Sequence, residues 1–215
     1  MRNQQMFMRW PLLFMGIFLV FAMGCDKEEE IDLANTFKDS RDGRIYRTVD
    51  IEDQVWMAEN LAFQPSGGNV WAYGNLGAYA ETYGYLYDWE TARNVCPPGW
   101  RLPDDADWTQ LIDFLGGEVF GGGKLKATGT FESGTGLWNA PNTGATNETG
   151  FTALPGGGRY QNGAFGSLGS FGIWWSDTEF DAEHAEYLSL GYNRSDIYRN
   201  HYDKGHGFAV RCLMN

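Results

Sequence analysis

The sequence predicts an α+β fold with strands at both ends of the domain and two short helices between them. The 215 residues include 29 glycines, 9 tryptophans, 11 tyrosines and 14 phenylalanines. Many short strands joined by glycine turns are typical of such a composition, and only two segments carry apolar residues at helical spacing. A long glycine- and asparagine-rich stretch, residues 136–172, is too aromatic for disorder and is interpreted as ordered loops with short strands.

Residues 1–24 have the composition of an export signal and are set apart from the fold. Arg2 and Arg9 precede an apolar run that is shorter than the roughly 20 residues a membrane-spanning helix needs. The run ends at Cys25 among small residues, which resembles a bacterial lipobox, in which the cysteine thiol is acylated. We therefore expect a lipoprotein signal peptide and a lipid on Cys25. An uncleaved anchor helix and an ordinary signal peptide are the alternatives.

Residues 25–41 are polar and acidic, without an apolar periodicity that could bury a face. They are interpreted as an acidic tether between the lipid and a domain that spans residues 42–215. An acidic cluster just after the lipidated cysteine is similar to the surface-export signal of lipoproteins in the Bacteroidota. This similarity implies a location on the outer face of the outer membrane, and a charged linker without an address is the alternative.

The charge balance bears on the partners of the chain. The formal net charge is −12, and loss of the two arginines of the signal makes it more negative. Nucleic acid is therefore not an expected partner, and contact with the membrane is expected through the lipid alone.

Hydrophobic patterning places the individual elements. Residues 45–51 and 54–57 are expected to form a β-hairpin. The first helix is expected over residues 88–95, before two prolines that cannot continue it. The second is expected to begin after an N-cap at Asp104 and to end at Gly116-Gly117. Four further strands are expected at residues 173–176, 186–190, 196–201 and 207–213.

Three cysteines set the expected redox chemistry. With Cys25 acylated, Cys96 and Cys212 remain as an even pair in an exported protein, and we expect them to form a disulfide between the end of the first helix and the last strand. A redox-active or nucleophilic thiol is the alternative, but it lacks a CxxC spacing and an adjacent basic group.

A resemblance to a known family covers residues 42–213. The segments DGRIYRTVDIEDQVWMAENL, YGYLYDWETARNVCPPGWRLPDDADW, GGKLKAT, NETGFTALPGGGR, WWSDTE and GFAVRC resemble successive motifs of the Fibrobacter succinogenes major paralogous domain family. Its members are typically secreted or lipid-anchored proteins of unassigned biochemistry. The resemblance implies a C-type lectin-like fold, with two short helices, twisted antiparallel sheets and a long glycine-rich loop region. In such folds a disulfide links the first helix to the final strand, in agreement with the expected bridge.

Enzymatic activity is not expected. The C-type lectin-like fold also occurs in formylglycine-generating enzymes, and residues 101–108 are similar to one of their segments, but those enzymes use a copper-binding cysteine pair that this chain does not offer. The acidic residues between Asp177 and Glu183 are interpreted as a solvated loop rather than as an acid and base pair. No catalytic residue and no cofactor is predicted.

No metal site is predicted either. His184, His201 and His206 form no close ligand pattern. The EPN, QPD and WND triplets that hold calcium in sugar-binding lectin-like domains are absent, and the nearest approximation is residues 175–177. Calcium dependence is therefore left open.

Aromatic and amide side chains in the glycine-rich region provide the candidate ligand surface. Sugar rings stack on aromatic faces while amides and carboxylates bind their hydroxyls. The candidate ligand-binding residues are Trp138, Asn142, Asn147, Tyr160, Asn162 and Asp177. The sequence thus predicts a non-catalytic, lipid-anchored domain that binds an extracellular glycan or an envelope protein. A structural or adhesion subunit of the envelope is the alternative.

Overall fold

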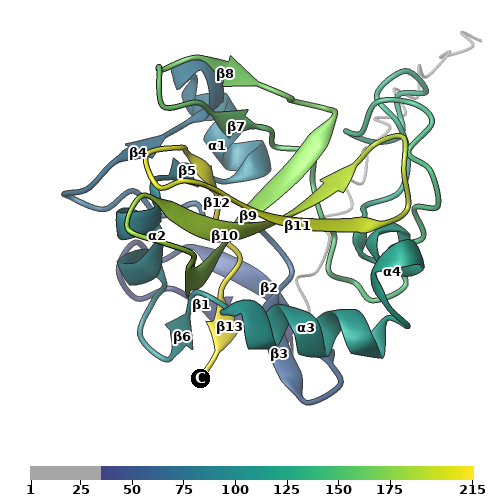
Figure 1. The fold of residues 1–215 in the computed structure, drawn as a ribbon, viewed down its shortest axis with the longest axis horizontal. Coiled ribbons are helices and arrows are strands. Elements are labelled where there is room, and N and C mark those ends of the chain that lie inside the picture. Colours follow the sequence, from purple (N-terminus) through teal and green to yellow (C-terminus); the bar gives the residue numbers. More distant parts are fainter. Residues whose placement is uncertain (1–34) are drawn as a thin grey trace, which may run out of the picture. The chain divides into compact units, whose positions relative to one another are not determined.

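The computed structural model describes residues 35–215, which form an α+β domain with two larger sheets and a small hairpin sheet (Figure 1). Cys25 and the predicted signal peptide lie outside the described residues. Within residues 35–215, no helix is both long enough and apolar enough to cross a membrane.

Two sheets carry most of the strands. The five-stranded sheet has the order β1-β2-β3-β13-β6, and the six-stranded sheet has the order β11-β10-β9-β12-β5-β4. Among the named strands of residues 35–215, all pairings are antiparallel except that of β12 with β9. The strands are β1 (Thr36–Lys38), β2 (Ile45–Ile51), β3 (Gln54–Met57), β4 (Val70–Trp71), β5 (Leu86–Tyr87), β6 (Trp100–Arg101), β7 (Gly158–Arg159), β8 (Phe165–Gly166), β9 (Phe171–Glu179), β10 (His184–Gly191), β11 (Ile197–Asp203), β12 (Phe208–Ala209) and β13 (Leu213–Met214).

The expected strands are all present, with one difference near the C-terminus. The predicted hairpin is β2–β3, β9 and β10 are longer than the segments expected for them, and β11 is shifted from the expected 196–201 to Ile197–Asp203. The strand expected over residues 207–213 is instead divided into β12 and β13, which belong to different sheets. The short segment between them crosses from one sheet to the other.

Four α-helices lie within the described residues: α1 (Gly77–Tyr83), α2 (Trp89–Val95), α3 (Asp105–Phe114) and α4 (Glu118–Leu125), and a 3-10 turn, η2 (Tyr73–Asn75), precedes α1. The two predicted helices are α2 and α3. Asp88 caps α2 by accepting from the Thr91 amide, and Asp104 and Asp107 form a capping box at α3. These caps satisfy amides that the helix leaves without internal partners.

Helices α1 and α4 were not predicted. Helix α4 contains Gly121, Gly122 and Gly123, and each glycine lowers helix propensity by about 1 kcal/mol. The packing of α4 against its neighbours requires glycine at two of these positions. A Cβ on Gly122 would lie 2.6 Å from the Asp196 carbonyl oxygen, and one on Gly123 would lie 2.3 Å from the Gly144 carbonyl oxygen. The close approach of α4 to its neighbours therefore outweighs the local preference.

The hydrophobic core consists of two clusters of buried side chains. One packs α3 and α4 against the inner face of β9–β11 and contains Trp56, Trp108 and Trp174. The other packs α2 against β5 and β12 and contains Trp89 and Trp175. These tryptophans are at most 1 % exposed, in keeping with a structural role.

The expected disulfide joins Cys96, at the end of α2, to Cys212, just before β13, with the Cα atoms 6.0 Å apart. It closes a loop of 116 residues, for which chain entropy predicts a stabilisation of about 4–5 kcal/mol. The bridge holds α2 to the sheet that the last strand enters.

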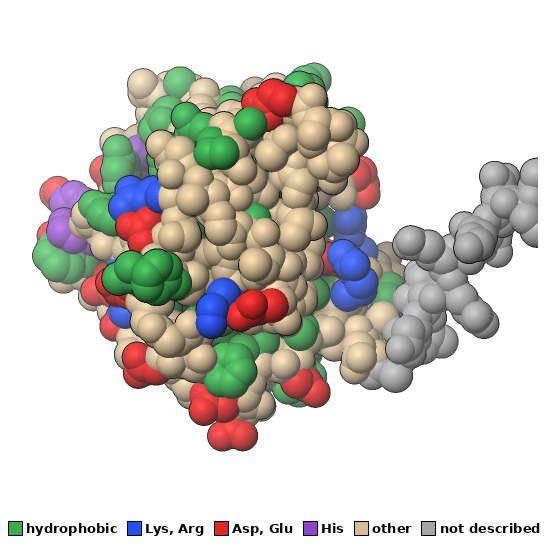
Figure 2. Space-filling view, turned by 90° about the vertical axis from the view of Figure 1, so that its right-hand side faces the viewer, with side chains coloured by type: hydrophobic (Ala, Val, Ile, Leu, Met, Phe, Trp, Pro, Cys, Tyr) green, Lys and Arg blue, Asp and Glu red, His purple; other side chains and the backbone are tan. Residues whose placement is uncertain are grey.

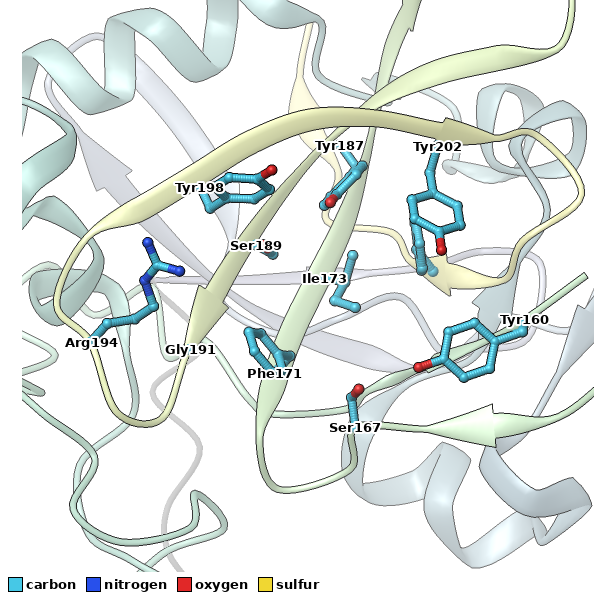
Figure 3. Close-up of a pocket in the computed structure, with 11 residues that line it drawn as sticks. Tyr160, Ser167, Phe171, Ile173, Tyr187, Ser189, Gly191, Arg194, Tyr198 and Tyr202 are labelled. Carbon is cyan, nitrogen blue, oxygen red and sulfur yellow. The ribbon is translucent and has the colours of Figure 1, made fainter.

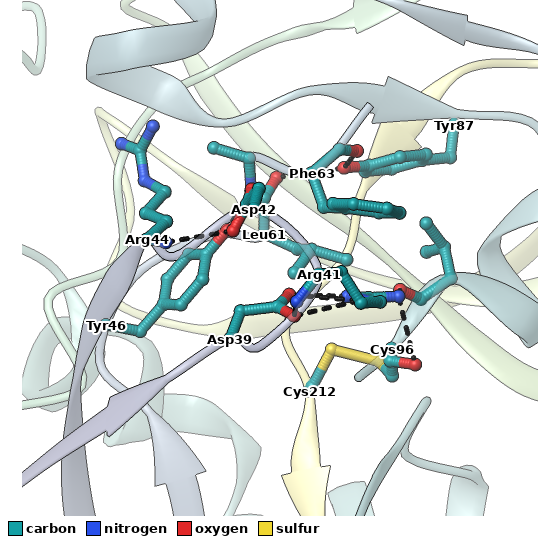
Figure 4. Close-up of polar contacts among 12 residues, drawn as sticks. Asp39, Arg41, Asp42, Arg44, Tyr46, Leu61, Phe63, Tyr87, Cys96 and Cys212 are labelled. Atoms are coloured by element: carbon teal, nitrogen blue, oxygen red, sulfur yellow. Dashed lines mark hydrogen bonds and ion pairs between the residues drawn. A yellow bond between two sulfur atoms is a disulfide. The ribbon is translucent and has the colours of Figure 1, made fainter. Parts of the chain in front are cut away.

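The last part of the predicted tether belongs to the fold, so the expected domain boundary at residue 42 is wrong. Strand β1 pairs with β2, and Asp39 is 0 % exposed. Arg41 binds both carboxylate oxygens of Asp39, donates to the Val95 carbonyl oxygen at 2.8 Å and lies 3.8 Å from the Phe63 ring centroid (Figure 4). The acidic composition of residues 25–41 concealed that this segment folds, because the Asp39 carboxylate is paired with Arg41 in a contact that the sequence does not show.

Two fully buried cations tie loops to the core. The Lys126 ammonium donates to the Thr143, Gly191 and Arg194 carbonyl oxygens, each at 2.9 Å. The Arg211 guanidinium donates to the side-chain oxygen of Asn60 and to two main-chain carbonyl oxygens. Burial lowers the pKa of Lys126 to about 8 and that of Arg211 to about 9. Lys126 belongs to the motif GGKLKAT and Arg211 to the motif GFAVRC. These two motif residues therefore have a structural role in the fold.

Candidate functional site: a tyrosine-lined groove

A groove of about 280 Å³ lies on the outer face of β9, β10 and β11, opposite the face that packs on α3 and α4 (Figure 3). Its volume is near the lower end of those typical of ligand sites. Aromatic rings form most of its walls, and one charged side chain lies at one end. The lining residues are Tyr160, Ser167, Phe171, Ile173, Tyr187, Ser189, Gly191, Arg194, Tyr198, Tyr202 and Phe208.

Strand alternation places these side chains on one face. In β10, Tyr187, Ser189 and Gly191 face the groove, whereas Leu188 and Leu190 point into the core. The same alternation in β11 directs its tyrosines outward and Ile197 inward.

The hollow results from the pairing of small residues with large ones. Ser189 lies opposite Tyr198, and Ala185 lies opposite Tyr202, so that each tyrosine stands beside a gap. Tyr187 lies diagonally between the two tyrosines, with ring centroids 6.4 and 6.1 Å away. The pairing register of β10 and β11 therefore determines the shape of the groove.

The β7–β8 hairpin supplies the remaining wall. Its turn is closed by a hydrogen bond from the Tyr160 amide to the Ala164 carbonyl oxygen at 2.7 Å. A Cβ on Gly166 would lie 2.9 Å from the Tyr160 ring, so the glycine allows the ring to lie on the hairpin. Ser167 follows with φ 68°, a left-handed conformation that costs a non-glycine residue about 1 kcal/mol or more. This strained residue holds its hydroxyl at the groove.

Most of the hydroxyl groups in the groove are unused by the protein. Within residues 35–215, the side-chain hydroxyls of five lining residues make no hydrogen bond: Tyr160, Tyr187, Tyr202, Ser167 and Ser189. In Figure 3 the Tyr160 and Tyr202 hydroxyls point toward the space between the walls. Each hydroxyl can donate one and accept up to two hydrogen bonds. The groove therefore presents apolar ring faces beside several open hydrogen-bonding positions.

Protonation states in the groove are set by burial. Burial raises the pKa of Tyr187 to about 12, and the neighbouring Tyr198 and Tyr202 add to the rise. His206 is 7 % exposed and packs edge-on against Tyr202, with ring centroids 4.3 Å apart. Burial lowers the pKa of His206. Tyr187 and His206 are therefore neutral at neutral pH.

Of the six residues predicted to bind ligand, Tyr160 lines the groove and Trp138 is a clear error. Trp138 is 0 % exposed, and its indole nitrogen donates to the Ala153 carbonyl oxygen at 3.0 Å. A side chain without exposed surface cannot stack on a sugar. Its place in a glycine-rich segment suggested a loop surface, but the loop folds over it.

The predicted asparagines serve the loops themselves. Asn142 is 6 % exposed, donates to the Ala127 and Gly129 carbonyl oxygens, each at 2.9 Å, and does not line the groove. Asn147 exchanges hydrogen bonds with Thr152 across a turn. Asn162 accepts from the Ala164 amide in the β7–β8 turn. Neither Asn147 nor Asn162 lines the groove.

Asp177 is committed elsewhere. It accepts from Arg93 of α2 at 2.7 Å and does not line the groove. On the side of the domain shown in Figure 2, backbone and uncharged polar groups predominate and hydrophobic side chains lie in separate spots. The predicted surface and the observed groove therefore share Tyr160 alone.

Sequence reasoning missed the tyrosines of β10 and β11 and Arg194 between these strands. A usable signal was present, because alternate residues of SDIYRNHYD place Tyr198 and Tyr202 on one face of a strand. Recognising a groove also required the pairing register, which a single sequence does not give.

The histidines and carboxylates form no metal centre in the described part of the chain, where no group of three or more potential ligands comes together. His184 pairs with Asp181 through Nδ1 at 2.8 Å, and the His201 ring stacks on Phe180 with ring centroids 3.6 Å apart. These contacts account for two of the three histidines on structural grounds.

Fold and site together define an α+β domain with an aromatic groove on the outer face of an antiparallel sheet. Residues 49–214 match the model of the Fibrobacter succinogenes major domain. The chain therefore belongs to this family, as the sequence motifs indicated. No curated protein matches the chain, and no solved structure matches it.

Proposed function

We propose that the protein is a lipid-anchored surface protein whose domain has a C-type lectin-like fold and binds an extracellular glycan in the tyrosine-lined groove. The observation that carries this proposal is the combination of aromatic faces with hydroxyl groups that the described protein leaves unpaired. Sugar rings present C–H groups that suit aromatic faces and hydroxyls that need partners.

A binding role rather than a catalytic one is supported by the cysteines. Cys96 and Cys212 are joined to each other, so residues 35–215 offer no thiol pair for the chemistry of formylglycine-generating enzymes. The groove itself is lined by no carboxylate, whereas acid–base glycosidases need two.

The direct test is binding of the full chain in detergent micelles to a panel of soluble polysaccharides. Tyr198→Ala and Tyr202→Ala each remove a ring that is 41 % exposed. Because stacking and hydrogen bonding are both lost, we expect affinity to fall about tenfold or more. Binding should persist in a chelator, since no carboxylate is available in the groove to hold calcium.

Phe131→Ala is the matched control, because Phe131 is 71 % exposed and does not line the groove. Its binding should equal that of the unaltered protein. The proposal would be contradicted if the Tyr198 and Tyr202 variants bound as tightly as the unaltered protein, or if the unaltered protein bound no polysaccharide.

A structural or adhesion subunit is the second candidate, favoured by three exposed apolar side chains on either side of the turn between α3 and α4. Phe114, Val119 and Phe120 are 52, 64 and 68 % exposed, and exposed apolar patches often mark protein contacts. This candidate predicts self-association that Phe120→Glu abolishes, as measured by sedimentation in detergent.

A further inference from the structure

One end of the groove carries a cation. Arg194 lies in the turn between β10 and β11 and is the one charged side chain among the lining residues (Figure 3). Its side chain is 46 % exposed, so the guanidinium is within reach of a molecule in the groove.

The position of Arg194 is fixed from beneath by the buried ammonium of Lys126. This group donates to the carbonyl oxygens of Gly191, at the end of β10, and of Arg194, within the turn. A Cβ on Gly191 would lie 3.0 Å from the Arg194 side chain, so the glycine leaves room for its stem. The guanidinium carbon lies 5.9 Å from the Tyr198 ring centroid. The cation is therefore held beside the first aromatic ring of the groove.

Part of the guanidinium remains available. Its Nε and Nη2 atoms donate to Asp196, whereas Nη1 makes no hydrogen bond to the described residues 35–215. Asp196 does not line the groove. A group in the groove therefore meets one unused donor of a guanidinium whose charge the paired Asp196 partly offsets, and no carboxylate lines the groove itself.

These contacts favour a negatively charged ligand group over a neutral one. A hydrogen bond between a guanidinium and an anion is roughly twice as strong as one between neutral groups. Because the cation lies at one end of an aromatic groove, a molecule that fills the groove would place its anion at Arg194 and its apolar faces against the tyrosine rings.

We propose that this end of the groove is a subsite for the anionic substituent of an acidic sugar, either a carboxylate or a sulfate ester. This inference rests on the proposed glycan binding and names its ligand class. Stacking on the tyrosines positions the ring, and Arg194 Nη1 donates to the acidic oxygen.

The experiment compares three probes with the full chain in detergent micelles: an oligogalacturonide, its fully methyl-esterified form and a sulfated galactan oligosaccharide. Esterification removes the charge while keeping the sugar. We expect the unaltered protein to bind the acid about tenfold more tightly than the ester. Tighter binding of the oligogalacturonide would identify the anion as a carboxylate, and tighter binding of the sulfated galactan would identify it as a sulfate ester.

Arg194→Gln should bring the ratio of acid to ester affinity close to one. Arg93→Gln is a matched control, because the Arg93–Asp177 pair has side chains 42 and 37 % exposed, against 46 and 33 % for Arg194–Asp196. The control should keep the full ratio, which separates a local contact from a general effect of charge.

The outcomes also separate this inference from the glycan-binding proposal. If acid and ester bind equally and Tyr198→Ala weakens both, the acidic subsite is wrong and the groove remains a glycan site. A ratio that Arg194→Gln leaves unchanged likewise overturns the subsite. Failure of all three probes and of neutral polysaccharides overturns both.

Discussion

The loops after α4 and the outer face of β9–β11 are both rich in aromatic and polar side chains, but they use them differently. In the loops, Trp138 is buried and the Asn142 amide nitrogen donates to two carbonyl oxygens. On the sheet, Tyr198 and Tyr202 are each 41 % exposed, and the Tyr187 and Tyr202 hydroxyls make no hydrogen bond to residues 35–215. The difference teaches that composition alone does not show whether aromatic and polar side chains are used within the fold or are left accessible in a hollow.

Trp138→Ala tests the loop side of this comparison and should have the largest effect. Replacing a fully buried tryptophan with alanine costs about 3–5 kcal/mol of unfolding free energy. Urea denaturation measures this loss. Glycan affinity of the fraction that remains folded should be unchanged.

The matching variant on the sheet is Tyr198→Ala, for which we expect a loss of only about 1 kcal/mol because the residue is 41 % exposed and lies outside the core clusters. If Trp138→Ala instead reduced binding without lowering stability, the distinction between the two regions would be lost.

Lys126→Met should come next in size, because it removes the ammonium that ties the loops to the β10–β11 turn. Three carbonyl oxygens lose their partner, and we expect a loss of about 2–3 kcal/mol after the gain from not burying a charge. Chemical denaturation at neutral pH provides the measurement, and an unchanged or raised stability would contradict the structural role.

The same variant has a pH signature. The folded pKa of Lys126 is lowered to about 8 from an ordinary 10.5 by burial. Between these values the unfolded chain binds the additional proton, so this group's contribution to stability rises with pH. The unaltered protein should therefore gain stability relative to Lys126→Met between pH 8 and 10.

The smallest expected effect is the pH dependence of stability that comes from His206, which packs against Tyr202 of the groove. Burial lowers its pKa below the ordinary 6.5, so the unfolded chain takes up a proton first as the pH falls. Stability is then lost from about pH 6.5 downward. Comparing urea midpoints at neutral and acidic pH for the unaltered protein and His206→Gln isolates this slope. An identical pH dependence in both proteins would contradict it.

Local signals in the sequence were sufficient for much of the fold. Helical spacing followed by two prolines predicted α2, Asp104 marked the start of α3, and the alternation in residues 45–51 marked a strand of the β2–β3 hairpin. Helix α4 could not be found in this way, because its glycines are selected by contacts with residues far along the chain. The inclusion of Asp39 in the fold depends likewise on a partner set by tertiary structure.

The site was less predictable than the fold. Tyr160 was named because it is an aromatic residue in a glycine-rich segment, and by the same reasoning Trp138 was named wrongly. The two residues differ because the loops cover Trp138 and leave Tyr160 exposed. The groove also depends on the pairing of Ser189 with Tyr198, and that register arises only when β10 and β11 associate.

The division of the C-terminal segment between two sheets has a consequence for the order of events in folding. Strand β12 lies between β9 and β5, and β13 lies between β3 and β6, so neither sheet can be completed before residues 208–214 are synthesised. A nascent chain that contains the β2–β3 hairpin and the helices but lacks β12 and β13 exposes unpaired strand edges. Both sheets therefore form only after residues 208–214 have followed, and the many contacts distant in sequence slow folding.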